Sequence, residues 1–352
     1  MYSSAPIHLC YRRFLITRSG THPLRNGSFF AGSFSAFFSR SFRCNYVHTS
    51  PRNSYPSETS TPHPYSAGSR LDLQFILEAG TGFRPLSVDI VKPFEPFSSA
   101  VVLLVKPQSR NEAQAQALGL PSQFIAKITD RRFTDREEEG FPAWSLSYES
   151  SFRTTIERAL EEKPWIDTVS YLYPDNEDEV AWEEPWVKEL ELYEARKLAH
   201  DMEVAAYQHL YSLQGTDIPR FFGTFRLSAQ PPVPHHTHTL AASMFDYLEG
   251  MALEYIDSFT MDQVRPDIDI PRKDVQRASK KALQIMKRLR DLHMIHNDSH
   301  ARNVLIRRDP PHNPMLIDFG LACFKPPLMS VAEWKESIQG IDEIKQMRDS
   351  LP

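Results

Sequence analysis

The chain has 352 residues, 41% of them hydrophobic and 24% charged, so it is long enough to bury one large core or two smaller ones. Its apolar runs are much shorter than the roughly 20 residues that cross a bilayer. Its three cysteines, Cys10, Cys44 and Cys323, match neither a disulfide framework nor a zinc pattern. The composition therefore predicts no transmembrane span and no disulfide-stapled domain, and it favours a reducing compartment.

The net charge of -5 is unevenly distributed along the chain. Residues 1–57 contain seven arginines and no lysine or acidic residue, so the rest of the chain has 33 of the 40 basic residues and all 45 acidic ones. An acidic body of this kind repels nucleic acid, so we expect no nucleic-acid partner.

The amino-terminal 50 residues are rich in arginine, serine and aromatic residues, which is the composition of a mitochondrial presequence. A disordered tail or a wrongly extended start is the alternative. Residues 51–69 are rich in Pro, Ser and Thr and predict a linker, so the folded part is expected to begin near Arg70. The expected location is mitochondrial, or cytoplasmic if there is no presequence.

The next part of the chain predicts strands and then a long helix. Apolar, β-branched runs at 85–91, 99–106 and 123–128 predict three antiparallel strands. An acidic insert at about 134–184 follows, and residues 186–215 contain no Gly or Pro before Gly215, which predicts one long helix. Further strands are expected at 220–227 and 240–248.

The carboxyl-terminal part begins with a second helix over 272–293, in which apolar residues recur every three or four positions. Two short strands, "VLI" and "MLI", then flank a turn. Residues 332–347 predict a closing amphipathic helix.

Polar side chains stand next to these two short strands. "IHNDSHARNVLI" (295–306) and "LIDFG" (316–320) present Asp298, Asn303 and Asp318 at strand ends, where their oxygens can meet a metal while apolar neighbours anchor the backbone. The pattern resembles the protein-kinase-like superfamily, whose catalytic loop reads H-R-D-x-x-x-x-N and whose metal-binding motif reads D-F-G. The resemblance covers roughly residues 84–340.

The resemblance implies a site for ATP and Mg²⁺. Asp298 would act as the base that orients the acceptor hydroxyl, while Asn303 and Asp318 would hold the metal and His296 would brace the loop. "FIAKI" resembles the V-A-I-K strand, which makes Lys127 the candidate for the α- and β-phosphates.

Two further groups would complete the nucleotide site. Glu203 is the expected carboxylate partner of Lys127, with Glu194 as the alternative. "FDYL" (245–248) would end the last strand where the adenine is held, which implies contacts from Asp246 and Leu248.

The implied fold is α+β and two-lobed. Residues 70–248 would form an antiparallel β-sheet N-lobe with one long helix and the acidic insert, and residues 249–352 a short, mainly helical C-lobe. "KPFEPFSS", where the glycine-rich phosphate loop should be, contains no glycine. Only 32 residues follow Gly320, and they contain no A-P-E motif, which puts peptide phosphorylation in doubt.

The acceptor is left open by the sequence. His300 is the second candidate catalytic residue. It follows Asp298 by two residues, where protein kinases often carry a lysine that meets the γ-phosphate and aminoglycoside and choline kinases often carry a histidine, whereas D-F-G is the protein-kinase form. The implied function is transfer of the γ-phosphate of ATP to an unknown hydroxylated acceptor, as in protein kinases. The alternatives are a small-molecule kinase, and a pseudokinase that binds nucleotide or acts as a scaffold.

Overall fold

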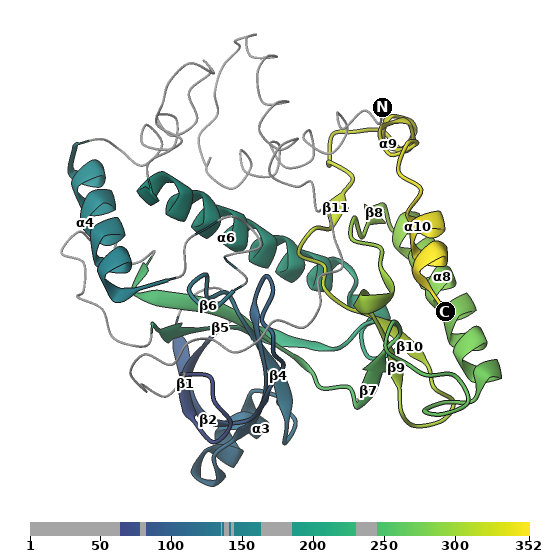
Figure 1. Cartoon of the computed structure of the whole chain (residues 1–352), viewed down its shortest axis with the longest axis horizontal. Coiled ribbons are helices and arrows are strands. Elements are labelled where there is room, and N and C mark those ends of the chain that lie inside the picture. Colours follow the sequence, from purple (N-terminus) through teal and green to yellow (C-terminus); the bar gives the residue numbers. More distant parts are fainter. Residues whose placement is uncertain are drawn as a thin grey trace.

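The computed structural model describes residues 64–77, 82–134, 136, 141, 144–162, 185–229 and 245–352. The predicted presequence, most of the linker and much of the acidic insert lie outside the described residues. The fold is mixed α/β, with antiparallel sheets (Figure 1). None of the helices in the described part of the chain has the length and apolarity needed to cross a bilayer.

A closed antiparallel barrel, in the order β1-β2-β3-β4-β6-β5, forms the amino-terminal part of the described chain. Its strands are β1 (Arg70–Ile76), β2 (Phe83–Pro93), β3 (Val101–Pro107), β4 (Phe124–Ile128), β5 (Phe221–Ser228) and β6 (Tyr247–Glu254). Alternate side chains, such as Phe124, Ala126 and Ile128 of β4, point into the barrel and are fully buried there. The strands predicted at 85–91, 99–106, 123–128 and 220–227 are confirmed.

Residues 240–244 of the strand predicted at 240–248 lie outside the described residues, and the strand ends later than predicted, because β6 runs from Tyr247 to Glu254. Gly250 lies in the middle of β6. A Cβ on this glycine would stand 2.5 Å from Cε2 of Phe225, so the absence of a side chain lets the Phe225 ring pack against the strand. β1 was not predicted. Tyr65, within the predicted linker, is 1% exposed, and its hydroxyl donates to Asp130 Oδ2 at 2.6 Å. The packed region therefore begins at or before Tyr65, earlier than the predicted start near Arg70.

Six helices are present in the described ranges: α3 (Glu112–Ala117), α4 (Leu146–Glu162), α6 (Pro185–His209), α8 (Arg272–Asp291), α9 (Val331–Ser337) and α10 (Glu343–Ser350). α6 and α8 confirm the two predicted helices. α6 crosses from the barrel to the carboxyl-terminal part of the chain (Figure 1). There Ala206, Tyr207 and Leu210 pack in the same core as the buried face of α8.

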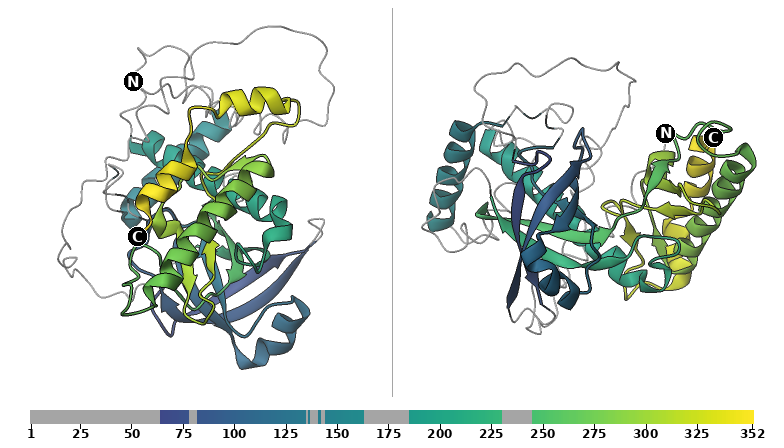
Figure 2. Two further views of the ribbon diagram at one scale, coloured as in Figure 1. Left: turned by 90° about the vertical axis from the view of Figure 1, so that its right-hand side faces the viewer. Right: turned by 90° about the horizontal axis from the view of Figure 1, so that it is seen from below.

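Short strands and the last two helices complete the second core. β7 (Ser258–Thr260), β9 (Val304–Arg307) and β10 (Pro314–Leu316) form one sheet, and β8 (Met294–Ile295) pairs with β11 (Cys323–Phe324). The single closing helix predicted at 332–347 is two helices, since Asp342 caps a new helix by accepting from Lys345 N. α10 lies against α8 (Figure 2).

Candidate functional site

Three charged side chains from distant segments meet beside the barrel. Lys127 Nζ on β4 lies 2.6 Å from Glu203 Oε2 on α6 and 2.8 Å from Asp318 Oδ1. The neighbours of Lys127 point into the barrel, so the period of two along the strand directs Lys127 outward, toward α6. Lys127 therefore pairs with Glu203, whereas no contact between Lys127 and Glu194 is found in the part of the chain that the structure describes.

The electrostatics of this cluster follow from its burial and its charges. Burial alone would lower the pKa of Lys127, but the Asp318 and Glu203 carboxylates outweigh it and raise that pKa. The Lys127 charge lowers the pKa of Asp318, and burial opposes this only in part. Burial raises the pKa of Glu203, an effect that Lys127 counteracts. Lys127 is therefore cationic and Asp318 anionic at neutral pH, as phosphate and metal binding require.

The loop between β8 and β9 holds the other predicted catalytic residues. Asn303 Nδ2 donates to Asp298 Oδ2 at 2.7 Å and to the Asp298 carbonyl oxygen at 3.0 Å. His300 caps the 3₁₀ turn Ala301–Asn303, and its Nδ1 accepts from Arg302 N at 3.1 Å. Asp298 and His300 are half-buried and Asn303 is buried, so the loop presents a fixed carboxylate at a partly open surface.

Backbone hydrogen bonds connect this loop to the segment that carries Asp318. Ile317 N donates to the carbonyl oxygen of Asn303 at 3.0 Å, and the Ile317 carbonyl oxygen accepts from His296 Nε2 at 3.0 Å. Phe319 is fully buried between the rings of Tyr207 and His296. Asp298, Asn303 and Asp318 thus belong to one braced unit, and His296 makes a bracing contact.

Helix α10, near the end of the described chain, also holds the Asp298 loop in place, through a contact that the sequence did not reveal. Glu343, the first residue of α10, is 0% exposed, and its Oε1 accepts from Asn297 N at 2.5 Å and from Ser299 Oγ at 3.2 Å. Ser350 Oγ at the end of α10 accepts from Ala301 N at 3.0 Å. An acidic residue in the first turn of a helix is so common that the sequence offered no signal for this role.

A small cavity of about 20 Å³ adjoins Lys127. Ser99 and Ala100, from the glycine-free connection between β2 and β3, line it together with Lys127 and Asp318. Gly320 also lines it, and a Cβ there would lie 3.4 Å from Ala199 Cβ on α6. The connection that would cover the phosphates is therefore next to the lysine, as the resemblance implies, although it lacks glycine.

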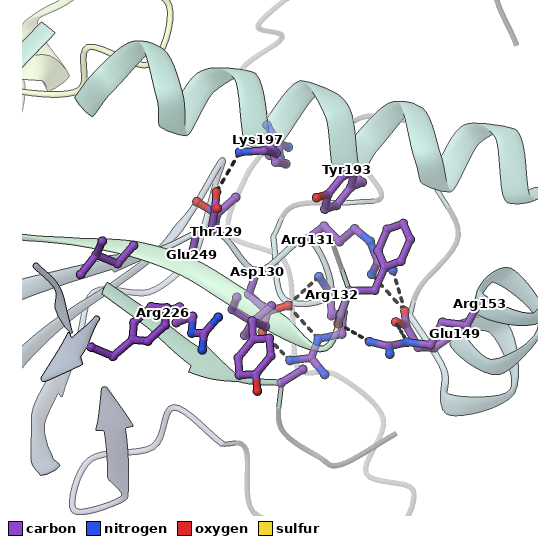
Figure 3. Close-up of a pocket in the computed structure, with 17 residues that line it drawn as sticks. Thr129, Asp130, Arg131, Arg132, Glu149, Arg153, Tyr193, Lys197, Arg226 and Glu249 are labelled. Carbon is purple, nitrogen blue, oxygen red and sulfur yellow. Dashed lines mark hydrogen bonds and ion pairs between the residues drawn. The ribbon is translucent and has the colours of Figure 1, made fainter. Parts of the chain in front are cut away.

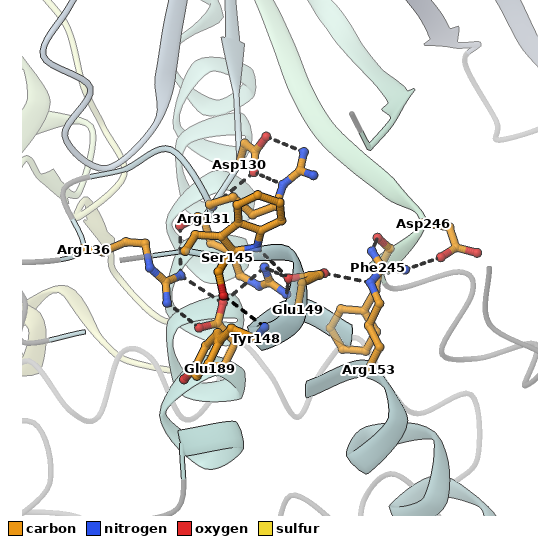
Figure 4. A network of polar contacts seen from close by, with 12 residues as sticks. Asp130, Arg131, Arg136, Ser145, Tyr148, Glu149, Arg153, Glu189, Phe245 and Asp246 are labelled. Atoms are coloured by element: carbon orange, nitrogen blue, oxygen red, sulfur yellow. Dashed lines mark hydrogen bonds and ion pairs between the residues drawn. The ribbon is translucent and has the colours of Figure 1, made fainter. Parts of the chain in front are cut away.

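The structure does not support the reasoning that placed Asp246 and Leu248 at the adenine. Asp246 directly precedes β6 and Leu248 is its second residue, so neither stands at the end of the strand. Leu248 lines a different cavity at the end of the barrel (Figure 3). Asp246 Oδ1 accepts from Arg153 Nη1 at 2.6 Å, within a network of buried ion pairs (Figure 4). The strand that was expected to end at Leu248 continues to Glu254, so these two residues do not stand at its end.

The donor set fits a magnesium ion that is bound together with a nucleotide. Asp318 supplies an ionised carboxylate. The amide nitrogen of Asn303 donates to Asp298, so its Oδ1 is the atom that could bind a metal ion. In the described ranges no group of three or more His, Cys, Asp or Glu side chains could hold a metal ion. One carboxylate and one amide oxygen suit Mg²⁺, which usually takes its other ligands from phosphates and water.

Part of the chain matches a known protein family. Residues 235–332 match the model of the phosphotransferase enzyme family. The matched segment contains β6, α8, the Asp298 loop and Asp318. No curated protein matches the chain. The match supports a kinase-type phosphotransferase and does not specify the acceptor.

Proposed function

We propose that this chain is an ATP-dependent phosphotransferase that transfers the γ-phosphate to a hydroxyl group. The observation that carries the proposal is the meeting of Lys127, Glu203 and Asp318 beside a loop in which Asn303 holds Asp298. The phosphotransferase family match over 235–332 supports the same reaction class.

Each of these side chains has a chemical task in the proposed reaction. Lys127, held by Glu203, would neutralise charge on the phosphates, and Asp298 would orient the acceptor hydroxyl and take its proton. Asp318 and Asn303 would hold Mg²⁺, which when bound supplies charge neutralisation on the transferred phosphoryl group.

The two-lobed kinase architecture is part of this proposal. The barrel with α6 would be the N-lobe, and the core around α8 would be the C-lobe, with boundaries near the predicted 70–248 and 249–352. In the described chain, β6 ends at Glu254 and β7 begins at Ser258. We therefore place the adenine beside the connection at 255–257 and not beside Asp246.

A small hydroxylated metabolite is the second candidate acceptor. His300 stands where aminoglycoside and choline kinases often carry a histidine. This histidine favours a metabolite, whereas the D-F-G motif favours a protein.

The proposal is tested by incubating the purified full chain with γ-labelled ATP, Mg²⁺ and a cell extract separated into protein and small-molecule fractions. We expect label in one fraction, and its loss when Asp298→Asn replaces the wild type. Label in the small-molecule fraction would identify a metabolite kinase. Magnesium-dependent ATP binding without transfer would instead support a pseudokinase, and the absence of both binding and transfer would refute the proposal.

A further inference from the structure

A second cavity, of about 200 Å³, lies at the end of the barrel (Figure 3). The chain following β4, the start of β6, α4 and the first half of α6 enclose it. Thr129 and Arg196 line both this cavity and the small one beside Lys127, but the residues proposed to act on the nucleotide do not line it. The proposed phosphotransfer reaction therefore does not account for this cavity.

The lining of this cavity is mainly cationic. Five arginines and a lysine line it: Arg131, Arg132, Arg153, Arg196, Arg226 and Lys197. The carboxylates in the lining are Asp130, Glu149 and Glu249. Further carboxylates, Glu189 and Asp246, hold Arg131 and Arg153 in the network of Figure 4.

Arg226 is a cation of this lining for which the described part of the chain provides no carboxylate partner. Its Nε donates to Gln74 at 3.0 Å, and its guanidinium carbon lies 3.6 Å from the ring centre of Phe83 and 4.2 Å from that of Tyr247. The two rings cover guanidinium faces, which leaves the N–H edge as the part that can bind a ligand. An arginine edge presents parallel donors that match the oxygens of a phosphate.

Arg132 adds a second, independent indication. Its side chain is 2% exposed, and its Nε and Nη2 both donate to Asp130 at 2.8 Å. Its Nη1 is buried, and the described residues provide it with no hydrogen-bond acceptor. The nearby rings of Phe133 and Trp144 give cation–π contact but no acceptor oxygen. A buried charged N–H without an acceptor costs stability, which a bound anion would recover.

Tyr193 provides a neutral donor in the same lining. Burial and the nearby carboxylates of Glu194 and Glu249 raise the pKa of its phenol, so it remains protonated at neutral pH. Its ring packs against Phe245 with 4.9 Å between ring centres, which fixes its position on α6. A protonated phenol can donate to an anion without adding charge.

We infer that this cavity is a binding site for a small anion of the phosphate class, with the Arg226 edge and Arg132 Nη1 as its charged donors. The volume of about 200 Å³ accommodates a phosphate group with a small substituent, given that a water molecule occupies about 30 Å³ of liquid. The site is distinct from the place of the ATP phosphates at Lys127.

Isothermal titration calorimetry of the full chain with inorganic phosphate, without nucleotide or magnesium, tests the inference. Chloride at matched ionic strength measures the nonspecific salt effect. We expect saturable binding that Arg226→Gln weakens about tenfold or more, the scale of a lost hydrogen-bonded charge pair. Arg226→Lys should weaken it less, because lysine keeps the charge but loses the paired donors.

The matched control is Arg84→Gln, which removes the same charge from β2, outside the cavity lining. It should leave phosphate affinity unchanged. Modification of the wild type by phenylglyoxal, mapped by peptide mass, gives a readout that does not depend on variant folding, and phosphate should protect Arg226. No saturable binding, equal affinity in Arg226→Gln and wild type, or modification of Arg226 unaffected by phosphate would each overturn the inference.

Discussion

The contact between α10 and the Asp298 loop allows a sharp test, because Glu343 is remote in sequence and fully buried. Replacing it by alanine removes the acceptor for Asn297 N and Ser299 Oγ. A hydrogen bond to a charged group contributes about 1.5–3 kcal/mol to folding stability, and two bonds to the same carboxylate contribute less than twice this amount. Asn297 also has a φ of 62°, a left-handed conformation that its surroundings must hold in place. We expect Glu343→Ala to lower the free energy of unfolding by about 2–4 kcal/mol.

The same change should affect turnover more than ATP binding. Asp298 directly follows Asn297, and a misplacement of about 1 Å at a catalytic group can reduce the rate about a hundredfold. Lys127 and Asp318 do not contact Glu343, so the KM for ATP should change little. We expect kcat to fall by about tenfold to a hundredfold. Glu343→Gln keeps an acceptor oxygen without the charge and should restore part of kcat. A coupled ATP turnover assay, with unfolding measured in parallel, gives both quantities.

Glu333→Ala is the matched control at the same end of the chain. Glu333 Oε2 accepts from Ser330 N at 2.8 Å in the capping box of α9, whereas the acceptor for Asn297 N and Ser299 Oγ is Glu343 on α10. Its loss should cost about 1 kcal/mol of stability and leave kcat unchanged. If Glu343→Ala also leaves kcat per folded molecule unchanged, Glu343 only stabilises the fold, and its role in positioning the loop is refuted.

Three other predictions concern the proposed reaction and the amino terminus. Asp318→Asn should abolish magnesium-dependent ATP binding and turnover, whereas Asp298→Asn should keep binding and lower kcat about a hundredfold, as calorimetry and turnover assays would show. Lys127→Met should lower the free energy of unfolding by about 3–5 kcal/mol near neutral pH, because it leaves the buried Glu203 carboxylate without its cation. The loss should be smaller in acid, since burial raises the pKa of Glu203 and the carboxylate without its lysine then becomes protonated. Urea unfolding at two pH values tests this. Residues 1–50 fused to a fluorescent protein should enter mitochondria, and a diffuse cytosolic signal would contradict the predicted presequence.

The sequence predicted the Lys127 cluster well because each member lies in an element with a strong local signal. Lys127 is in a run of β-branched and apolar residues, and Glu203 is in a helix without Gly or Pro. The resemblance to the D-F-G and V-A-I-K motifs marked Asp318 and Lys127, and the helix offered Glu203, with Glu194 as the alternative partner of the lysine. One residue of rotation along a helix is about 100°, and the tertiary packing of α6 decides which carboxylate reaches the lysine.

The sequence could not predict α4 or the true position of β6. α4 contains several Ser and Thr residues, which have modest helix propensity, and buried ion pairs such as Arg153 with Glu149 and Asp246 hold it in place. β6 continues past Leu248 through Gly250, where the missing side chain makes room for Phe225. In both cases, contacts between distant segments outweigh the local preference.

The different exposures of the two carboxylates around Lys127 suggest how the site could receive a nucleotide. The side chain of Glu203 is 3% exposed on α6, whereas that of Asp318 is 34% exposed. The cavity of about 20 Å³ beside Lys127 has room for about one water molecule, which needs about 10–15 Å³, so in the proposed reaction a phosphate group would reach the ammonium by displacing one of its two carboxylate contacts. Opening the contact with Glu203 would leave a buried carboxylate unpaired, whereas opening the contact with Asp318 releases a group that solvent or a metal can satisfy. In the proposed reaction, Lys127 should therefore exchange its contact with Asp318 for one with phosphate and keep its contact with Glu203.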